Sequence, residues 1–301
     1  MQQVQLNDWR ISHIFSELIL PLGLLGFNKV KNQLAILLQD SKYLDWNNSF
    51  EKMEKAFEAG LFVLVIGPKG TGKTTLVREF ARKKSLNLDS INFSLRTRES
   101  HLVGTKTLEN GTVGFIEGLL VKSMREGSML YLDEINSAEA DVLLRLDEAL
   151  DDRRQLVLKE STGETIIARD GWFVVATINP LTHVGTKELP PQIISRFPVR
   201  IRLEYPPEDI ELDIVKRHSS GSHEKELKQG IKLANTLRQA AAVEELYYSP
   251  SLRETIAYAK LLDLKVPAKE TAVIVFGNVY AQWGSVEYQK VSDIITSMFG
   301  N

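Results

Sequence analysis

A glycine-rich loop between a short apolar run and a helical segment is the feature that most constrains the fold. Residues 61–67 read LFVLVIG, a continuous apolar run rich in β-branched residues, which is typical of a strand covered on both faces of a parallel sheet. From Gly67 to Thr74 the chain matches the pattern G-x-x-x-x-G-K-[ST] at every fixed position, and helical periodicity follows over 73–84. This order of strand, loop and helix predicts a phosphate-binding loop in an α/β fold.

Each part of the loop has a predicted task. Gly67, Gly70 and Gly72 let the backbone turn so that consecutive N–H groups face the phosphates. Lys73 is expected to reach the β- and γ-phosphates, and the Thr74 hydroxyl is expected to ligate Mg²⁺. The alternative is a glycine turn that happens to be basic, but the pattern arises by chance in only about 1% of chains of this length. The predicted nucleotide-binding residues are Gly67, Pro68, Lys69, Gly70, Thr71, Gly72, Lys73, Thr74 and Thr75.

The rest of the chain divides into a region with strand signals and a region without them. Helical stretches separate three further apolar segments with the composition of strands: 90–94, 128–132 and 172–177. After Pro206-Pro207 strand signals stop, and five segments have the character of helices: 208–219, 224–243, 251–263, 268–281 and 285–298. Strands alternating with helices predict a parallel sheet. We therefore expect an N-terminal segment (1–45), an α/β domain (46–205) and a helical domain (206–301).

Two carboxylates follow the apolar strand segment 128–132. Asp133 at the carboxyl end of a strand can hold Mg²⁺, and Glu134 beside it can polarise a water molecule towards a γ-phosphate. Taken alone, an acidic pair after a strand is more often a solvated loop or a helix N-cap. Together with the phosphate loop, the pair favours a metal-binding residue and a catalytic base.

Further polar residues follow later strands and helices. Asn179 lies just after the strand segment 172–177 and could orient an attacking water, although Asn179-Pro180 could equally begin a turn. The segments Ser195-Arg196-Phe197 and Ser251-Leu252-Arg253 each place an arginine downstream of that strand. On the residues alone, the first arginine could be a surface ion-pair residue and the second an exposed residue of a helix.

The order of these features resembles a known family. The phosphate loop, the acidic strand end, the asparagine-tipped strand and the two arginine segments follow one another as in the AAA+ ATPases, over nearly all of residues 46–301. Segments 103–118 and 155–168 resemble the two hairpins of the MoxR branch, and Ser251-Leu252-Arg253 is more similar to its CbbQ/NorQ-like members. The resemblance implies a P-loop NTPase αβα sandwich with a parallel sheet, followed by a small all-helical lid domain.

The resemblance also implies roles for single residues. Asp133 would position Mg²⁺, Glu134 would be the catalytic base, and Asn179 matches sensor 1. Arg196 matches the arginine finger that acts on the γ-phosphate of a neighbouring subunit, and Arg253 matches sensor 2 in the lid. With Lys73 on the phosphates, this set implies an ATPase that converts ATP and water to ADP and phosphate. It also implies a homo-oligomeric ring, with six subunits expected.

Three functions are compatible with these features. The first is a MoxR-type remodeller or chaperone that acts on a partner protein, with a von Willebrand A-domain protein on another chain expected. The second is a DNA-directed motor of the helicase or restriction-translocase type, and the third is a nucleotide switch with little turnover. Lys plus Arg is 37 against 39 Asp plus Glu, and both hairpin segments are poor in positive charge. Nucleic-acid binding is therefore disfavoured.

Composition and the N-terminal segment complete the sequence-based expectations. The chain has no cysteine, its apolar stretch over 18–27 is too short to span a bilayer, and its first residues lack the layout of a signal peptide. We therefore expect a cytoplasmic protein. Leu25-Gly26-Phe27 and the following helical segment 28–38 resemble the part that lines the adenine pocket in these ATPases, with core packing as the alternative. Trp46 is interpreted as a packing residue.

Overall fold

The computed structural model describes residues 43–109, 112–159, 163–180 and 187–300. The predicted helical segment 28–38 and Leu25-Gly26-Phe27 lie outside the described residues. Along the described stretches, no helix combines the length and apolar character that crossing a membrane requires.

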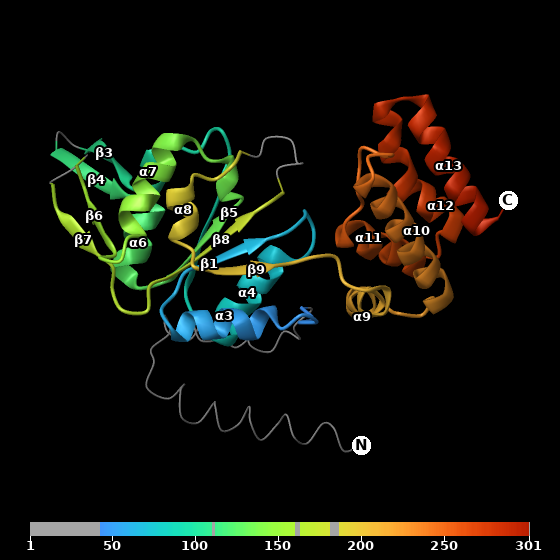
Figure 1. The fold of residues 1–301 in the computed structure, drawn as a ribbon, viewed down its shortest axis with the longest axis horizontal. Coiled ribbons are helices and arrows are strands. Elements are labelled where there is room, and N and C mark those ends of the chain that lie inside the picture. The colour runs from blue at the N-terminus through green and yellow to red at the C-terminus, as the bar shows by residue number, and fades with distance from the viewer. Residues whose placement is uncertain (1–42, 110–111, 160–162, 181–186, 301) are drawn as a thin grey trace, which may run out of the picture. The chain divides into compact units, whose positions relative to one another are not determined.

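A five-stranded sheet with the order β2-β5-β8-β1-β9 forms the centre of the N-terminal part (Figure 1), and its neighbouring strands are all parallel. Its strands are β1 (Val63–Ile66), β2 (Leu88–Asn92), β5 (Met129–Asp133), β8 (Phe173–Ile178) and β9 (Val199–Arg202). The inner strands β1 and β8 are buried along almost their whole length, which explains their continuous apolar sequences. The predicted α/β class with a parallel sheet is confirmed.

Strand β9 has no counterpart among the predicted strands. It pairs with β1 at the edge of the sheet, where only Ile201 is buried and Arg200 and Arg202 are exposed. A short edge strand with one covered face lacks the continuous apolar run that marks the inner strands. The sequence signal was therefore too weak, and β9 was missed, whereas the four predicted segments of the sheet are all strands.

Helices cover both faces of this sheet. The helices are α3 (Ser49–Glu58), α4 (Lys73–Lys83), α6 (Leu119–Glu126), α7 (Ala140–Ala149) and α8 (Pro191–Ser195). Helices α3 and α4 lie on one side, and α6, α7 and α8 lie on the other (Figure 1). This division follows from right-handed crossovers, because the chain moves in one direction along the sheet from β1 to β2 and in the opposite direction afterwards.

Two antiparallel hairpins extend from this αβα sandwich. The first joins β3 (Gly104–Glu109) to β4 (Thr112–Glu117), between α5 (Glu99–Leu102) and α6. The second joins β6 (Gln155–Val157) to β7 (Thr165–Ile167), just before β8. Both predicted hairpins are thus present. Arg125 of α6 links them, because its guanidinium contacts Glu117 at 2.7 Å and Glu164 at 2.8 Å.

The C-terminal part is helical and has an apolar cluster of its own. Its α-helices are α9 (Glu208–His218), α10 (Glu224–Ala242), α11 (Leu252–Asp263), α12 (Ala268–Ala272) and α13 (Ser285–Phe299). Leu237, Tyr258 and Phe276 are among the buried members of the cluster. The predicted single helix over 268–281 is instead α12, a π-helical turn (Val273–Gly277) and a 3-10 segment (Asn278–Trp283).

Candidate functional site

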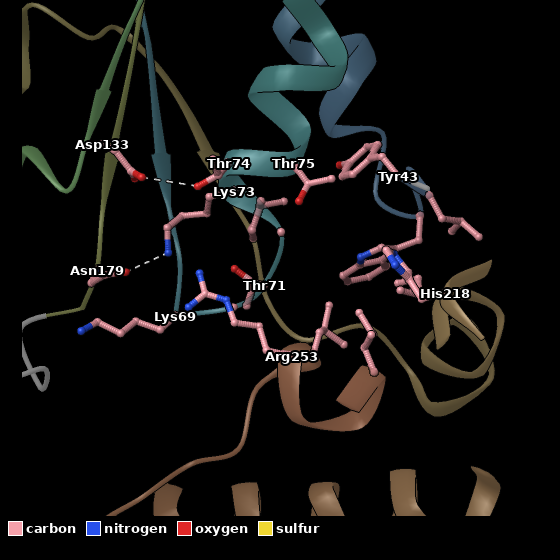
Figure 2. Close-up of a pocket in the computed structure, with 18 of the residues that line it drawn as sticks. Tyr43, Lys69, Thr71, Lys73, Thr74, Thr75, Asp133, Asn179, His218 and Arg253 are labelled. Carbon is pink, nitrogen blue, oxygen red and sulfur yellow. Dashed lines mark hydrogen bonds between the residues drawn. The ribbon is translucent and has the colours of Figure 1, made fainter. Parts of the chain in front are cut away.

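A pocket forms where the phosphate loop meets the carboxyl ends of β5 and β8. Residues 69–75 of the loop line it, together with Asp133, Glu134 and Asn179. The carboxyl ends of parallel strands share one edge of the sheet, so residues far apart in the sequence meet there. Figure 2 shows Lys73 directed towards Asn179 and Thr74 directed towards Asp133.

Lys73 is held inside the phosphate loop by three acceptors. Its Nζ donates to Gly67 O at 2.6 Å, to Pro68 O at 2.8 Å and to Asn179 Oδ1 at 2.9 Å. Burial lowers the pKa of Lys73 to about 8, although the nearby carboxylates of Asp133 and Glu134 act in the opposite direction. The ammonium group therefore lies among neutral oxygens that an incoming phosphate can replace.

Thr74 and Asp133 offer hard oxygen ligands on the same side of the pocket. Thr74 Oγ1 lies 3.5 Å from Asp133 Oδ2. The other carboxylate oxygen, Oδ1, accepts from the Tyr131 hydroxyl and from the Thr177 hydroxyl, each at 2.6 Å. A hydroxyl and an oriented carboxylate are the protein ligands that Mg²⁺ takes alongside phosphates, so these residues fit that cation.

Tyr131 and Thr177 were not among the predicted site residues. Each lies two residues before a predicted one, Asp133 on β5 and Asn179 after β8. Because side chains alternate along a strand, residues two apart share a face, and this alternation was the signal that could have identified both.

Glu134 and Asn179 are joined directly. Asn179 Nδ2 donates to Glu134 Oε1 at 2.8 Å, while the same amide's Oδ1 accepts from Lys73. Glu134 has left-handed backbone angles, φ 55° and ψ 44°, and its N–H donates to Thr177 Oγ1 at 3.0 Å. Asn179 thus bridges the loop lysine and the carboxylate.

The structure places the two predicted arginines differently. Arg253, at the start of α11, lines the pocket, and Figure 2 shows its guanidinium directed towards the phosphate loop. Arg196 is not part of the lining. Its guanidinium pairs with Asp147 at 2.8 Å and with Asp151 at 3.0 Å, as expected for a surface ion-pair residue. The hydrogen bond to Asp147 raises the pKa of Arg196. Its role towards a neighbouring subunit stays a prediction.

The other end of the pocket is largely aromatic and aliphatic. Its lining residues are Tyr43, Leu44, Trp46, Leu203, Ile214, His218, Leu252 and Ile256. Such a surface suits a flat nucleotide base. Trp46, interpreted from the sequence as a packing residue, is half-buried and belongs to this lining.

A phosphate loop opening α4, an acidic β5 end and an asparagine after β8 define an AAA domain of the P-loop type. The family described as AAA domain (dynein-related subfamily) matches residues 62–197. The chain belongs to the AAA+ ATPase family, in which nucleotide binding and ATP hydrolysis are expected.

Two similar staphylococcal proteins are both described as uncharacterized. Protein SH1500 of Staphylococcus haemolyticus is 34% identical over 204 residues, covering 66% of this chain and 76% of that protein. Protein SERP0979 of Staphylococcus epidermidis is 35% identical over 194 residues, covering 63% and 73%. A crystal structure from Cytophaga hutchinsonii covers 90% of this chain and 94% of its own, with a TM-score of 0.48 and 21% identity. A likeness of that size says nothing about activity.

Proposed function

We propose that this chain is an ATP-hydrolysing, ring-forming remodeller of the MoxR type, in its CbbQ/NorQ-like branch. It would use ATP and Mg²⁺ and act on a protein partner, with a von Willebrand A-domain protein expected, to activate or mature an enzyme complex. The observation that carries the enzymatic part is the chain of contacts from Lys73 through Asn179 to Glu134. It joins a phosphate-binding cation to a base in one pocket.

Nucleotide binding would begin at the phosphate loop. The loop N–H groups and the start of α4 would take the phosphates, and Lys73 would exchange its carbonyl contacts for the β- and γ-phosphate oxygens. Thr74 and Asp133 would hold Mg²⁺, which when bound neutralises charge on these oxygens. Tyr131 would keep Asp133 turned towards Thr74 through its hydrogen bond to Oδ1.

Hydrolysis would use Glu134 as the base. Its carboxylate accepts a proton from a water molecule while the water oxygen bonds to the γ-phosphorus. The bond from that phosphorus to the bridging oxygen breaks, and ADP leaves with the electron pair, with Lys73 stabilising the added charge. Asn179 fixes the direction of the Glu134 carboxylate through the contact at 2.8 Å.

A protein partner is favoured by the surface of the first hairpin. Leu108 of β3 and Val113 of β4 are cross-strand partners, with 71% and 66% of their surfaces exposed. Lys106 is the single basic residue on these two strands. An apolar surface with little positive charge suits contact with a protein better than contact with a phosphate backbone, so the DNA-directed motor is not favoured.

The ring proposal depends on Arg196. In a ring, the γ-phosphate of a neighbouring subunit would compete with Asp147 and Asp151 for this guanidinium. Arg196→Ala should abolish hydrolysis yet regain part of it when mixed with Glu134→Gln subunits, which keep their own Arg196. Mixed rings that form but regain no hydrolysis would disprove action between subunits.

The partner can be identified with Glu134→Gln, which should bind ATP and not hydrolyse it. The immobilised variant with ATP and Mg²⁺ is exposed to lysate from its own source, with ADP as the control. A von Willebrand A-domain protein retained only with ATP is the expected result. Adding Leu108→Ser and Val113→Ser should release it, whereas adding Lys106→Gln should not. Retention of nuclease-sensitive DNA that Lys106→Gln weakens would establish the motor instead.

A further inference from the structure

Arg238 of α10 and Glu211 of α9 form an ion pair inside the helical part. The guanidinium Nη1 lies 2.6 Å from Glu211 Oε2 and Nη2 lies 2.9 Å from Oε1. Glu211 is fully buried and Arg238 is 7% exposed. A buried ion pair adds little net stability, because removing both charges from water offsets their attraction. The pair therefore calls for an explanation other than holding the two helices together.

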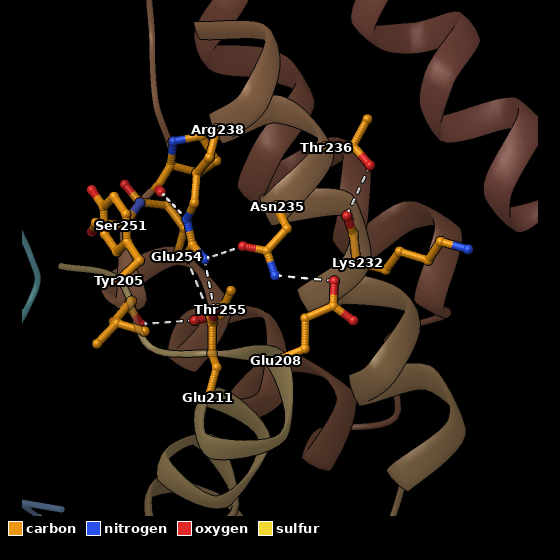
Figure 3. A network of polar contacts seen from close by, with 12 residues as sticks. Tyr205, Glu208, Glu211, Lys232, Asn235, Thr236, Arg238, Ser251, Glu254 and Thr255 are labelled. Atoms are coloured by element: carbon orange, nitrogen blue, oxygen red, sulfur yellow. Dashed lines mark hydrogen bonds and ion pairs between the residues drawn. The ribbon is translucent and has the colours of Figure 1, made fainter. Parts of the chain in front are cut away.

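The Nε group of the same guanidinium holds the turn at the start of α11. Arg238 Nε donates to Pro250 O at 2.8 Å, immediately before the N-cap residue Ser251. Ser251 Oγ accepts from Arg253 N at 3.2 Å, and Ser251 N donates to Glu254 Oε2 at 2.8 Å, which completes a capping box. Figure 3 shows the Arg238 guanidinium bonded to both Glu211 and Asn235. Arg238 thus holds the turn that carries Arg253.

The face of the guanidinium is connected to the phosphate loop. Its Cζ lies 4.3 Å from the centroid of the Tyr205 ring, and the Tyr205 hydroxyl donates to Lys69 O at 2.9 Å. The phosphate loop also approaches the N-cap of α11 directly, because a Cβ added to Gly70 would lie 2.3 Å from Ser251 Cβ. The loop and the first turn of α11 are therefore joined directly and through Arg238.

We propose that Arg238 is a positioning residue for nucleotide recognition, which keeps Arg253 at the phosphate end of the pocket and connects it to the loop at Lys69. This role rests on the proposed function, in which Arg253 contacts the γ-phosphate. Arginine supplies what the position needs: a fork for Glu211, a third donor for Pro250 and a flat face for Tyr205. A lysine has a single ammonium group with neither a fork nor a flat face, so it would keep only the positive charge beside Glu211.

The experiment compares affinities for a fluorescent, non-hydrolysable ATP analogue and for fluorescent ADP, both with Mg²⁺. Arg253→Ala sets the reference, and loss of a charge-assisted contact to the γ-phosphate should lower the ratio of the two affinities about tenfold to a hundredfold. The double variant Glu211→Met with Arg238→Met removes both charges and should lower the ratio equally, leaving ADP affinity unchanged. Adding Arg253→Ala to it should cause no further loss. Lys232→Met, an exposed residue of α10, is the matched control.

Arg238→Lys keeps the positive charge beside Glu211, yet it should still lower the ratio of analogue affinity to ADP affinity. Urea unfolding verifies that each variant folds. Three results would each overturn the inference. The double variant could lose ADP affinity and analogue affinity equally, or its loss could add to that of Arg253→Ala. The third such result is a ratio of the two affinities in Arg238→Lys that equals the wild-type ratio. A wild-type chain that prefers the analogue without hydrolysing ATP would refute the proposed function alone. A wild-type chain with no such preference would overturn the positioning role.

Discussion

Nucleotide affinity should fall with rising pH because of Lys73. Burial holds the pKa of this lysine at about 8 in the chain without nucleotide, well below the value of about 10.4 for a solvated lysine. Bound phosphates favour the charged form and raise the pKa again. Above about pH 8, binding must therefore be accompanied by uptake of a proton, and the affinity decreases as the pH rises.

The size of the effect follows from the protonated fraction of the free chain. With a pKa of about 8, this fraction falls from about nine-tenths at about pH 7 to about one-tenth at about pH 9. The dissociation constant should accordingly rise about tenfold, which corresponds to about 1.4 kcal/mol. The phosphates of the nucleotide contribute little to this change, because their own titration near about pH 6 is complete.

The assay is a titration of fluorescent ADP at several pH values under constant salt and saturating Mg²⁺. Lys73→Met is the matched variant, since it keeps most of the side-chain volume but cannot take up a proton. It should bind more weakly and show a flat profile over the same range. A flat profile in the wild-type chain, or an equal slope in Lys73→Met, would refute the reasoning.

Three further substitutions test the packing and the metal site. Tyr131→Phe removes a donor from the Asp133 carboxylate, which is proposed to hold Mg²⁺, and should raise the Mg²⁺ concentration needed for nucleotide binding about tenfold, with an unchanged requirement as the contrary result. Gly70→Ala places a Cβ against Ser251 at a φ of +70°, so ADP affinity and Tm should both fall, and equal values would contradict the described contact. Gly230→Ala places a Cβ 2.4 Å from the Tyr258 ring and should cost about 1–3 kcal/mol in urea unfolding, where an unshifted midpoint would argue against close packing.

Local patterns were sufficient for much of the fold. The strand before the phosphate loop and the strand that ends at Asp133 are buried on both faces, and their continuous apolar sequences are unmistakable. The hairpins were predicted from a family resemblance rather than from periodicity alone. Strand β9 was missed because its outward arginines interrupt the apolar pattern. Edge strands need only one apolar face, so their sequences carry less information.

The site could be predicted only where its residues belong to a motif. Lys73, Asp133 and Asn179 each follow a recognisable strand or loop, and the structure brings them together around one pocket. The buried pair of Arg238 and Glu211 could not be found in this way, because the two residues are 27 positions apart and meet only when helices α9 and α10 pack. A charged residue in a helical sequence predicts an exposed position, and only the tertiary structure shows that these two are buried.

The left-handed backbone of Glu134 implies a conflict between stability and activity. A residue with a Cβ loses about 1 kcal/mol in this conformation relative to glycine. The hydrogen bond to Thr177 does not offset this loss, because it comes from the backbone N–H, which glycine also has. Glu134→Gly should therefore give a chain that is at least as stable but lacks the carboxylate proposed as the base. A relative with glycine at this position would have exchanged the proposed base for a backbone without this strain. The identity of this one residue could then separate chains that hydrolyse the nucleotide from chains that only bind it.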